Sequence, residues 1–505
     1  MAARAPGAEG PSAPLLHALA ETGAIGSTAR QLADRIARPL PSVTRSLEEL
    51  SHRGAVLQIG RGLWILRDFE RLDARDDFVE PSVYTERFVA EGGPALGRYR
   101  GGITFSDNGV APVHRWWPYV QGYSAEFVAD LLERSELSPG ATVFDPFSGS
   151  GTTAVEARRA GFRALGSELL PPAVLAARVK TCFELSPERL GEWADRTIAS
   201  AEQRRPGPLP FLRETPRHFA PEVLAGLLRL REALPDDSTP EGRAVRVAFG
   251  RILIPVSRLR RSPCLGYGAP EPETPPDPVA ELRRAIAEMR SDLAALARGR
   301  ERWGPAARIE QTDARSMRLP KGRVGLAVTS PPYVNGMDYV MNYKLDLAWL
   351  GYAHSYGDLI ALRRAMVACD NLPRGAADAF LVPDRAPDPW LPAILQRIRA
   401  NVARKATYRR NDVHGIVHQY FVDLVPVLRR VYAGLAPGGR FVVVVGDSLL
   451  AGAYVPGDLL LARLGRSVGF AIESVEVARS RRSGQRRSFV LRESIVTLRK
   501  PSTVG

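Results

Sequence analysis

Apolar residues recur at helical spacing in three short segments at the start of the chain. In the third segment Val43, Leu47 and Leu50 lie four and three positions apart, which places them on one face of a helix. Ser27 and the Pro41-Ser42 pair are typical start signals. Two apolar runs then flank a Gly-Arg-Gly turn, as in a β-hairpin. The pattern predicts helices over residues 13–22, 28–36 and 42–53 and strands over 56–59 and 63–66.

Beyond residue 112 the hydrophobic pattern changes to an alternation of strand-like and helix-like segments. Such alternation predicts an α/β fold with a mainly parallel sheet. We divide the chain into an N-terminal unit at 1–70, a linker at 71–112 and a large α/β domain at 113–500. Proline-rich stretches bracket a helical insertion at about 204–300, and a second insertion, a candidate for target recognition, is expected at about 353–419.

Composition restricts the classes of protein to consider. The chain has 505 residues, with 69 Lys and Arg against 55 Asp and Glu and a net charge of +14. This charge favours a polyanionic partner, although an excess of arginine also accompanies GC-rich genomes. The three cysteines lack the spacing of a zinc site or a disulfide framework, so no metal is expected. Because the sequence has no apolar run of membrane length and no secretory signal, we expect a cytoplasmic protein without a membrane partner.

A strand followed by a turn of small residues predicts a nucleotide-type site. Residues 141–144 form the strand, and the string Asp145-Pro146-Phe147-Ser148-Gly149-Ser150-Gly151-Thr152-Thr153 follows it. Gly149 and Gly151 let the backbone approach a ligand at the carboxyl end of the strand, where open α/β sheets bind cofactors. A second strand ends in Glu168, about twenty residues beyond Asp145, the spacing at which an acidic side chain meets ribose hydroxyls. A dinucleotide is the alternative ligand for such a turn.

The complete string DPFSGSGTT resembles the first motif of DNA amino-methyltransferases, a family that uses S-adenosyl-L-methionine. The resemblance extends over about residues 114–500 and implies the Rossmann-like sheet of these enzymes. By this resemblance the following residues form the cofactor site: Asp145, Gly149, Gly151 and Thr152 at the methionine part, Phe147 beside the cofactor, Glu168 at the ribose, Tyr119 and Tyr123 over the methionine end, and Asp313 at the adenine amino group.

The segment Thr329-Ser330-Pro331-Pro332-Tyr333 follows the apolar strand 324–328. Its prolines lack N–H groups, so the loop presents carbonyl acceptors to an incoming amine. Hydrogen bonds to fixed acceptors would localise the lone pair of an exocyclic base amine toward a methyl donor. The base must leave the duplex to reach such a pocket, and Tyr333 is the ring expected to hold its face. Ser330, Pro331, Pro332 and Tyr333 are therefore the predicted catalytic residues.

The first residue of this tetrapeptide bears on the identity of the target base. SPPY resembles the motif of cytosine-N4 enzymes, whereas DPPY and NPPY are more usual for adenine-N6 enzymes and for protein-glutamine or RNA enzymes. Ser330 therefore favours N4-methylcytosine in double-stranded DNA. The order of the motifs departs from that of many SPPY enzymes, because Ser330 lies downstream of Asp145. Adenine-N6 DNA methylation and RNA base methylation stay open as alternatives.

Two regions are predicted to contact nucleic acid. Residues 1–70 resemble a winged helix-turn-helix, which implies that Arg45 lies on a recognition helix and Arg61 at a wing tip, although such units also dock on proteins. Residues 474–478 and 489–498 resemble the closing hairpin of a methyltransferase sheet, and the basic loop between these strands carries Arg481, Arg482, Arg486 and Arg487. A DNA-binding regulator with an inactive methyltransferase domain is the alternative from another class. Restriction or defence-system proteins are candidate partners.

Overall fold

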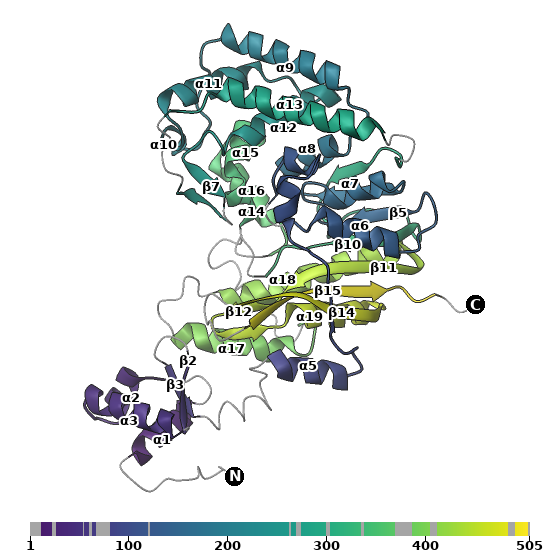
Figure 1. The fold of residues 1–505 in the computed structure, drawn as a ribbon. Helices are drawn as coiled ribbons and strands as arrows, with labels where there is room; N and C mark the ends of the chain where they lie inside the picture. Colours follow the sequence, from purple (N-terminus) through teal and green to yellow (C-terminus); the bar gives the residue numbers. More distant parts are fainter. Residues whose placement is uncertain are drawn as a thin grey trace.

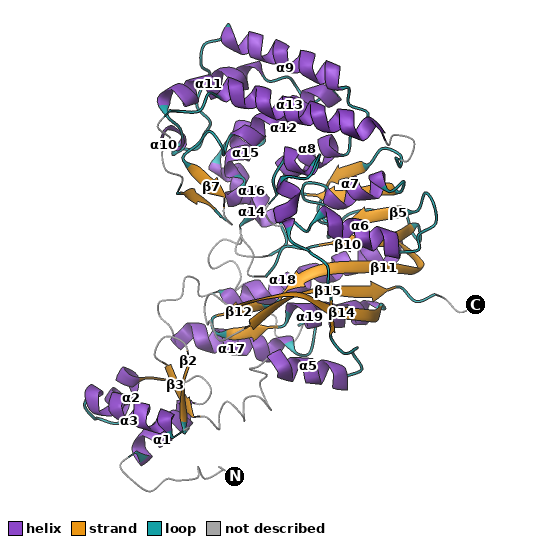
Figure 2. Ribbon diagram, in the orientation of Figure 1, coloured by secondary structure: helices purple, strands orange, loops and turns teal. Residues whose placement is uncertain are grey.

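The computed structural model describes residues 12–22, 27–53, 55–59, 63–66, 81–119, 122–261, 264–268, 274–298, 303–334, 338–368, 386–404, 412–482 and 490–502. Figure 1 shows a small N-terminal unit beside a larger body. In this body helices lie on both sides of a central sheet, and a helical lobe lies beyond one edge of the sheet (Figure 2).

The central sheet has eight strands in the order β4-β14-β15-β11-β10-β5-β6-β9 among the described residues. All neighbouring strands pair in parallel except β15, which is antiparallel to both β11 and β14. Their bounds in this order are Gly97–Arg98, Ala471–Arg482, Val490–Arg499, Leu435–Gly446, Val324–Thr329, Thr142–Asp145, Arg163–Glu168 and Arg308–Gln311. This is the Rossmann-like methyltransferase sheet that the sequence predicted, and the pairing of β14 with β15 confirms the closing hairpin.

Strand β11 shows why the sheet is covered on both faces. Its run of valines from Val442 to Val445 is buried throughout, and successive side chains point to opposite faces. Val442 and Val444 pack with helices α6 (Ala125–Arg134) and α7 (Thr152–Arg159). Val443 and Val445 belong to the cluster that includes α18 (Val413–Gly434) and α19 (Gly457–Val468). The strand begins at Leu435 and includes the Pro-Gly-Gly turn expected before it, where the register with β10 shifts.

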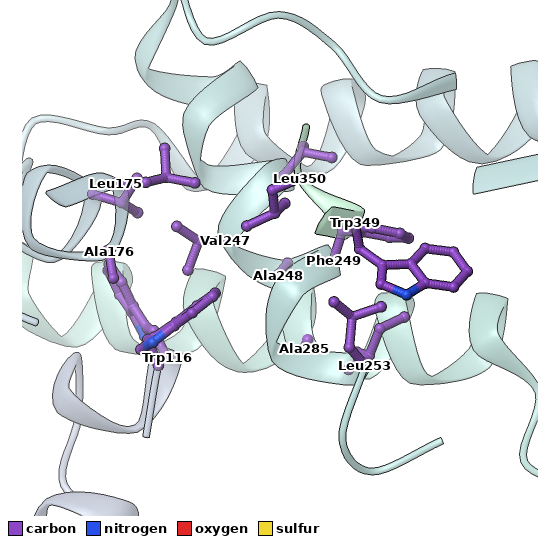
Figure 3. Close-up of a cluster of buried hydrophobic side chains, with 14 of the residues drawn as sticks. Trp116, Leu175, Ala176, Val247, Ala248, Phe249, Leu253, Ala285, Trp349 and Leu350 are labelled. Carbon is purple, nitrogen blue, oxygen red and sulfur yellow. The ribbon is translucent and has the colours of Figure 1, made fainter. Parts of the chain in front are cut away.

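The helical lobe packs around the apolar cluster shown in Figure 3, in which Phe249 and Trp349 have their ring centroids 6.3 Å apart. The lobe also includes α9, which contacts α11, α12 and α13 although it precedes the predicted start of the insertion. The helices in and next to the lobe are α8 (Pro171–Lys180), α9 (Pro187–Glu202), α10 (Thr215–His218), α11 (Pro221–Ala233), α12 (Pro240–Ile252), α13 (Pro278–Leu296), α14 (Tyr339–Asn342), α15 (Lys344–Trp349) and α16 (Tyr356–Ala365). Strands β7 (Leu259–Arg261) and β8 (Leu265–Tyr267) form a hairpin in it.

The prediction of a linker over residues 71–112 is wrong from residue 81 onward. Helix α5 (Pro81–Ala90) buries Tyr84 and Phe88, four positions apart, in the cluster that covers β11. Strand β4 then joins the sheet beside β14, and a 3₁₀ helix, η2 (Phe105–Gly109), follows. Charged residues and glycines dominate the sequence of this segment. The short amphipathic helix was therefore not recognised from the sequence pattern. On the same side of the sheet lie α17 (Leu391–Arg404) and the hairpin of β12 (Ser448–Leu450) and β13 (Ala453–Val455).

The N-terminal unit has the predicted helices and strands. They are α1 (Ala13–Thr22), β1 (Ser27–Thr28), α2 (Ala29–Arg35), α3 (Leu40–His52), β2 (Val56–Ile59) and β3 (Leu63–Leu66), with an antiparallel sheet of order β1-β3-β2. Thr28 caps α2 by a capping box with Gln31. Helix α3 begins two residues earlier than predicted, because Pro39 precedes it and Pro41 occupies its first turn, where no backbone donor is needed. The turn that carries Arg61 lies outside the described residues.

Candidate active site

The turn after β5 uses its glycines for close approach. Gly149 and Gly151 have φ values of +50° and +90°, in the left-handed region that favours glycine. A Cβ on Gly149 would lie 2.9 Å from the Tyr119 ring, and a Cβ on Gly151 would lie 2.9 Å from the Cβ of Ala177. Gly151 is the N-cap of α7, so the turn leads directly into the amino end of that helix. Only glycine fits this path of the backbone at both positions.

Asp145, the last residue of β5, is a buried hydrogen-bonding centre. Its Oδ1 accepts from the Phe147 N–H at 3.0 Å and from the Thr329 hydroxyl at 2.6 Å. Its Oδ2 accepts from the Tyr123 hydroxyl at 2.6 Å and from the Thr153 hydroxyl at 2.9 Å. Burial raises the pKa of Asp145, while these donors favour the charged form. The carboxylate therefore joins the glycine turn, the upstream aromatic segment and the end of β10.

The glycine turn and the Ser-Pro-Pro loop line one cavity. Strand β10 pairs directly with β5, so their carboxyl ends meet at the same edge of the sheet. The cavity encloses about 760 Å³ of empty space, part of which is open to solvent. Its lining includes Tyr119, Tyr123, Asp145, Phe147, Ser148, Gly149, Thr152, Glu168, Asp313, Ser330, Pro332 and Tyr339. The sequence placed these residues in two separate motifs and several flanking segments.

Glu168 lies at the end of β6 and lines the cavity. Its carboxylate accepts from three backbone N–H groups, those of Gly149 at 2.9 Å, Leu169 at 2.8 Å and Leu170 at 2.8 Å. Burial raises its pKa, and the three N–H donors oppose that rise. The neighbouring Ser148 hydroxyl is buried and has no hydrogen-bond partner among the described residues. A polar ligand in the cavity would supply the partner that this hydroxyl lacks.

Asp313 also lines the cavity, but Arg315 binds its carboxylate. The Arg315 guanidinium donates to both oxygens of Asp313, at distances of 2.8–3.1 Å, and also pairs with Asp423. It further donates to the Ala365 carbonyl oxygen at 2.7 Å, and residues 365–367 line the cavity next to Asp313. The sequence analysis missed this side of the site, because it assigned residues 353–419 to target recognition. That Asp313 binds adenine stays a prediction.

The Tyr333 side chain lies beside the cavity rather than in its lining. Its hydroxyl donates to the Glu493 carboxylate at 2.5 Å, and a Cβ on Gly446 would lie 3.0 Å from its ring. Glu493 also pairs with Arg479 on β14. Pro331 is buried and likewise absent from the lining. In this conformation the predicted stacking ring is held against the ends of β11 and β15, and its contact with a base stays a prediction.

A buried carboxyl pair lies at the carboxyl end of β11. Asp447 accepts from the Arg492 Nε at 3.0 Å, and Asp458 accepts from the Arg492 Nη2 at 3.2 Å and from the Ser494 hydroxyl at 2.8 Å. The Tyr454 hydroxyl also donates to Asp447. Burial, together with the charge of Asp458, raises the pKa of Asp447 to about 8. One guanidinium therefore serves two carboxyl groups.

The sequence also missed an aromatic contact that supports the cavity from the helical lobe. Tyr119 stacks on Tyr343 with ring centroids 5.5 Å apart and an interplanar angle of 17°. The Arg261 guanidinium lies 4.2 Å from the Tyr343 centroid and pairs with the buried Asp346 at 2.6 Å. These residues are far apart in the chain, and their spacing carries no motif.

Lys180 on α8 is a second contact that the sequence did not indicate. Its side chain is buried, and the Nζ donates to the Trp117 carbonyl oxygen at 2.7 Å and to the Ser150 hydroxyl at 3.2 Å. Burial lowers its pKa well below the usual value of a lysine. Lys180 therefore fixes the outer side of the glycine turn to the aromatic segment upstream.

The predicted nucleic-acid residues are only partly described. Arg45 is exposed on α3, and Arg481 is exposed near the end of β14. Arg482 ends β14, whereas Arg61, Arg486 and Arg487 lie outside the described residues. Contact with nucleic acid stays a prediction for all six. Within the described ranges no cluster of three or more His, Cys, Asp or Glu side chains could hold a metal ion, and none of the described helices is long and apolar enough to span a membrane.

The fold and the cavity together define a class. A mainly parallel sheet with one reversed strand, β15, between β11 and β14 is the Rossmann-like sheet of S-adenosyl-L-methionine-dependent methyltransferases. The cavity lies where the strand order reverses, next to β5 and β10, as expected for a cofactor in an open α/β sheet. The glycine turn and the unpartnered Ser148 hydroxyl fit a polar ligand there.

The chain is a relative of type II methyltransferases. It is 24% identical over 437 residues to Type II methyltransferase M.AvaI of Nostoc sp. (strain PCC 7120) and to the protein of that name in Anabaena variabilis. Each alignment covers 79% of this chain and 89% of the relative. It is 22% identical over 455 residues to Type II methyltransferase M.BsoBI of Geobacillus stearothermophilus, which covers 79% of this chain and 88% of the relative. These similarities confirm the methyltransferase resemblance of the two motifs and agree with S-adenosyl-L-methionine as the cofactor.

No protein-family model matches the chain. Among solved structures it is similar to the [4+2]-cyclase SpnF, with a TM-score of 0.30 and coverage of 83% of this chain and 94% of that one at 10% identity. A SAM-dependent methyltransferase from Methanosarcina mazei gives a TM-score of 0.26, with 74% and 97% coverage at 10% identity. These scores are too low to support an argument, so the fold class depends on the strand order itself.

Proposed function

We propose that this protein is a site-specific DNA methyltransferase that transfers a methyl group from S-adenosyl-L-methionine to the exocyclic amino group of a flipped base, with cytosine N4 as the target. One observation supports this proposal above the others. The glycine turn and the Ser-Pro-Pro loop line one cavity and are joined by the hydrogen bond from Thr329 to Asp145 at 2.6 Å. A methyl donor on the turn would therefore face an amine held by the loop.

The residues of the cavity divide into two groups by their chemistry. Glu168, Ser148 and the N–H groups of the turn are suited to the polar parts of S-adenosyl-L-methionine, which supplies an electrophilic methyl group when bound. Ser330 and Pro332 lie on the opposite lining segment, where prolines supply carbonyl acceptors and no donors. Close positioning of donor and amine in a site that excludes water would provide much of the rate.

The choice of base follows from the motif. Ser330 is the residue that favours cytosine N4, with adenine N6 in DNA or an RNA base as the alternative. A DNA substrate would place the reaction in the cytoplasm, with double-stranded DNA as the partner and a restriction or defence-system protein as a further candidate. The type II names of the relatives support a DNA substrate.

The test is mass spectrometry of nucleosides from duplex DNA and from RNA after incubation with methyl-labelled S-adenosyl-L-methionine. We expect label in N4-methylcytosine and its loss in Tyr333→Ala. Tyr99→Ala is the matched control, because Tyr99 also donates to a carboxylate, at 3.1 Å from Asp130, but lies outside the cavity lining. Label in N6-methyladenine or only in RNA would favour the alternatives. DNA binding without any label in wild type would favour the regulator.

A further inference from the structure

We infer that the β7–β8 hairpin of the helical lobe is a duplex-contacting surface, with Arg260 on a phosphate or base edge and Tyr267 as a second exposed contact on the other face of the hairpin. This inference depends on the proposed function, because it names the surface by which the same enzyme would hold its DNA. Target recognition could reside in the helical insertion at about 204–300, in the segment 353–419 or in the N-terminal unit, and the inference selects the first of these. It follows from the charge, exposure and contacts of the hairpin.

The hairpin lies in the most one-sided stretch of charge in the lobe. Residues 242–270 contain six arginines and no lysine, aspartate or glutamate. Five of these arginines have partners elsewhere in the lobe. Arg251 pairs with Glu288 and Arg261 with Asp346. The other three, Arg243, Arg246 and Arg258, donate to backbone carbonyl oxygens. Arg260 is exposed and has no ion-pair partner among the described residues. An unneutralised guanidinium in such a stretch matches a polyanion.

The strand pattern of β7 separates a structural face from a free one. Leu259 is buried in the core of the lobe, and Arg261 points to the same side, toward Asp346. Arg260, between them, points outward because successive side chains of a strand alternate. On the paired strand, Tyr267 is 59% exposed, with its ring 5.7 Å from that of His218 on α10. Tyr267 pairs directly with Leu259, so its ring lies on the same face of the hairpin as Leu259 and on the opposite face from Arg260. The hairpin thus exposes a cation on one face and an aromatic ring on the other, and both groups are suited to nucleic acid.

Neighbouring elements add further cations on the side of the hairpin that carries Tyr267. The backbone N–H of Arg258 donates to the His218 carbonyl oxygen at 2.8 Å, which holds the hairpin against α10. Arg217 on α10 is exposed. The pKa of His218 is lowered mainly by burial and further by the charge of Lys344 at the start of α15, so Lys344 lies near this histidine. Lys344 lies only five positions after Tyr339, which lines the cavity. The Tyr267 side of the hairpin is therefore near the segment that leads out of the cavity.

The hairpin is also fixed to the cofactor turn. From β7, Arg261 stacks on Tyr343, and Tyr343 stacks on Tyr119. Tyr119 in turn lies against Gly149 and lines the cavity. This continuous contact sets the distance between the hairpin and the cavity, so DNA bound at Arg260 would have a defined position relative to the transferred methyl group. Figure 1 shows β7 and α14 on the same side of the molecule as the left ends of β11 and β15.

The test compares Arg260→Ala with Arg283→Ala, an exposed arginine of the same lobe on α13 that pairs with Asp195. Binding of a mixed-sequence 40-base-pair duplex is measured by fluorescence anisotropy over a range of salt concentrations. Loss of one phosphate contact reduces the slope of log K against log salt by about 0.9, which corresponds to about eightfold weaker binding at 0.1 M salt. We expect this change in Arg260→Ala, a smaller one in Tyr267→Ala, and little change in Arg260→Lys or Arg283→Ala.

A parallel titration with S-adenosyl-L-methionine keeps the result interpretable. Arg260 is exposed, so its variants should bind the cofactor with wild-type affinity. If Arg260→Ala has the same salt slope and DNA affinity as Arg283→Ala while wild type methylates DNA, the hairpin inference is wrong and the proposed function stands. If wild type transfers no methyl group to DNA although it binds the duplex through Arg260, the proposed function fails instead.

Discussion

Replacing Asp145 by Asn tests whether this side chain holds the cofactor turn to the catalytic loop. The change keeps the shape of the side chain and replaces one acceptor oxygen by an NH₂ group. The Phe147 N–H cannot reverse its role as a donor, so the amide oxygen should occupy the Oδ1 position, which also accepts from Thr329. The NH₂ group would then face the hydroxyls of Tyr123 and Thr153, which now donate to Oδ2.

The expected loss follows from these four contacts. Hydrogen bonds to a charged group are worth about 1.5–3 kcal/mol each, and bonds between neutral groups about 0.5–1.5 kcal/mol. Two hydroxyls can rotate to accept, and the variant no longer buries a charge, whose desolvation raises the pKa of Asp145. A net cost of about 1–2 kcal/mol results, which is a factor of about 5–30 in an equilibrium constant. We expect this cost to divide between cofactor affinity and the stability of the free protein.

Calorimetric titration with S-adenosyl-L-methionine and thermal unfolding without ligand measure the two parts. Thr153→Val is the companion variant, because it removes one of the hydroxyls that the new NH₂ group would face. Since the two residues share a hydrogen bond, the double variant should be less impaired than the sum of the single variants. If Asp145→Asn bound the cofactor as wild type does and unfolded at the same temperature, Asp145 would have no part in fixing the turn.

Three further variants address other parts of the site. Gly149→Ala should weaken cofactor binding by about tenfold or more, because the new Cβ would lie 2.9 Å from the Tyr119 ring at a φ of +50°, where strain costs about 1–2 kcal/mol; wild-type affinity in a titration would refute this. Glu493→Gln keeps an acceptor for the Tyr333 hydroxyl, so it should lower kcat less than Glu493→Ala does, and both variants should bind the cofactor with unchanged affinity. Equal single-turnover rates for the two variants would contradict a role of Glu493 in positioning Tyr333. Asp447→Asn should flatten the dependence of stability on pH. The folded protein keeps a proton on Asp447 up to about pH 8, whereas the unfolded chain releases it near pH 4, so wild-type stability falls as pH rises between these values by up to about 1.4 kcal/mol per pH unit. Urea unfolding at pH 5.5 and 7.5 should therefore show the variant gaining stability relative to wild type at the higher pH. A constant difference would contradict a raised pKa for Asp447.

The sequence by itself determined the local parts of this protein. Helices and strands of the N-terminal unit follow from apolar spacing, because a helical face or a β-hairpin is specified by residues a few positions apart. The glycine turn after β5 and the proline-rich loop after β10 could be recognised for a related reason: backbone conformations that only glycine permits, or that proline imposes, leave a direct mark in the sequence. The closing hairpin was also predicted correctly, from its resemblance to the closing hairpin of a methyltransferase sheet.

Only the tertiary structure decided how these parts meet. The contact between Asp145 and Thr329 joins residues 184 positions apart, and no local spacing encodes it. The cavity wall at residues 365–367 is likewise not encoded locally, and the sequence analysis assigned it to target recognition. The Glu493 carboxylate that accepts from Tyr333 had been assigned no role. Helix α5 was missed because its two core residues, Tyr84 and Phe88, are buried only by packing with residues that lie hundreds of positions later in the chain. Local patterns select elements, whereas burial and long-range hydrogen bonding select which side chains share a site.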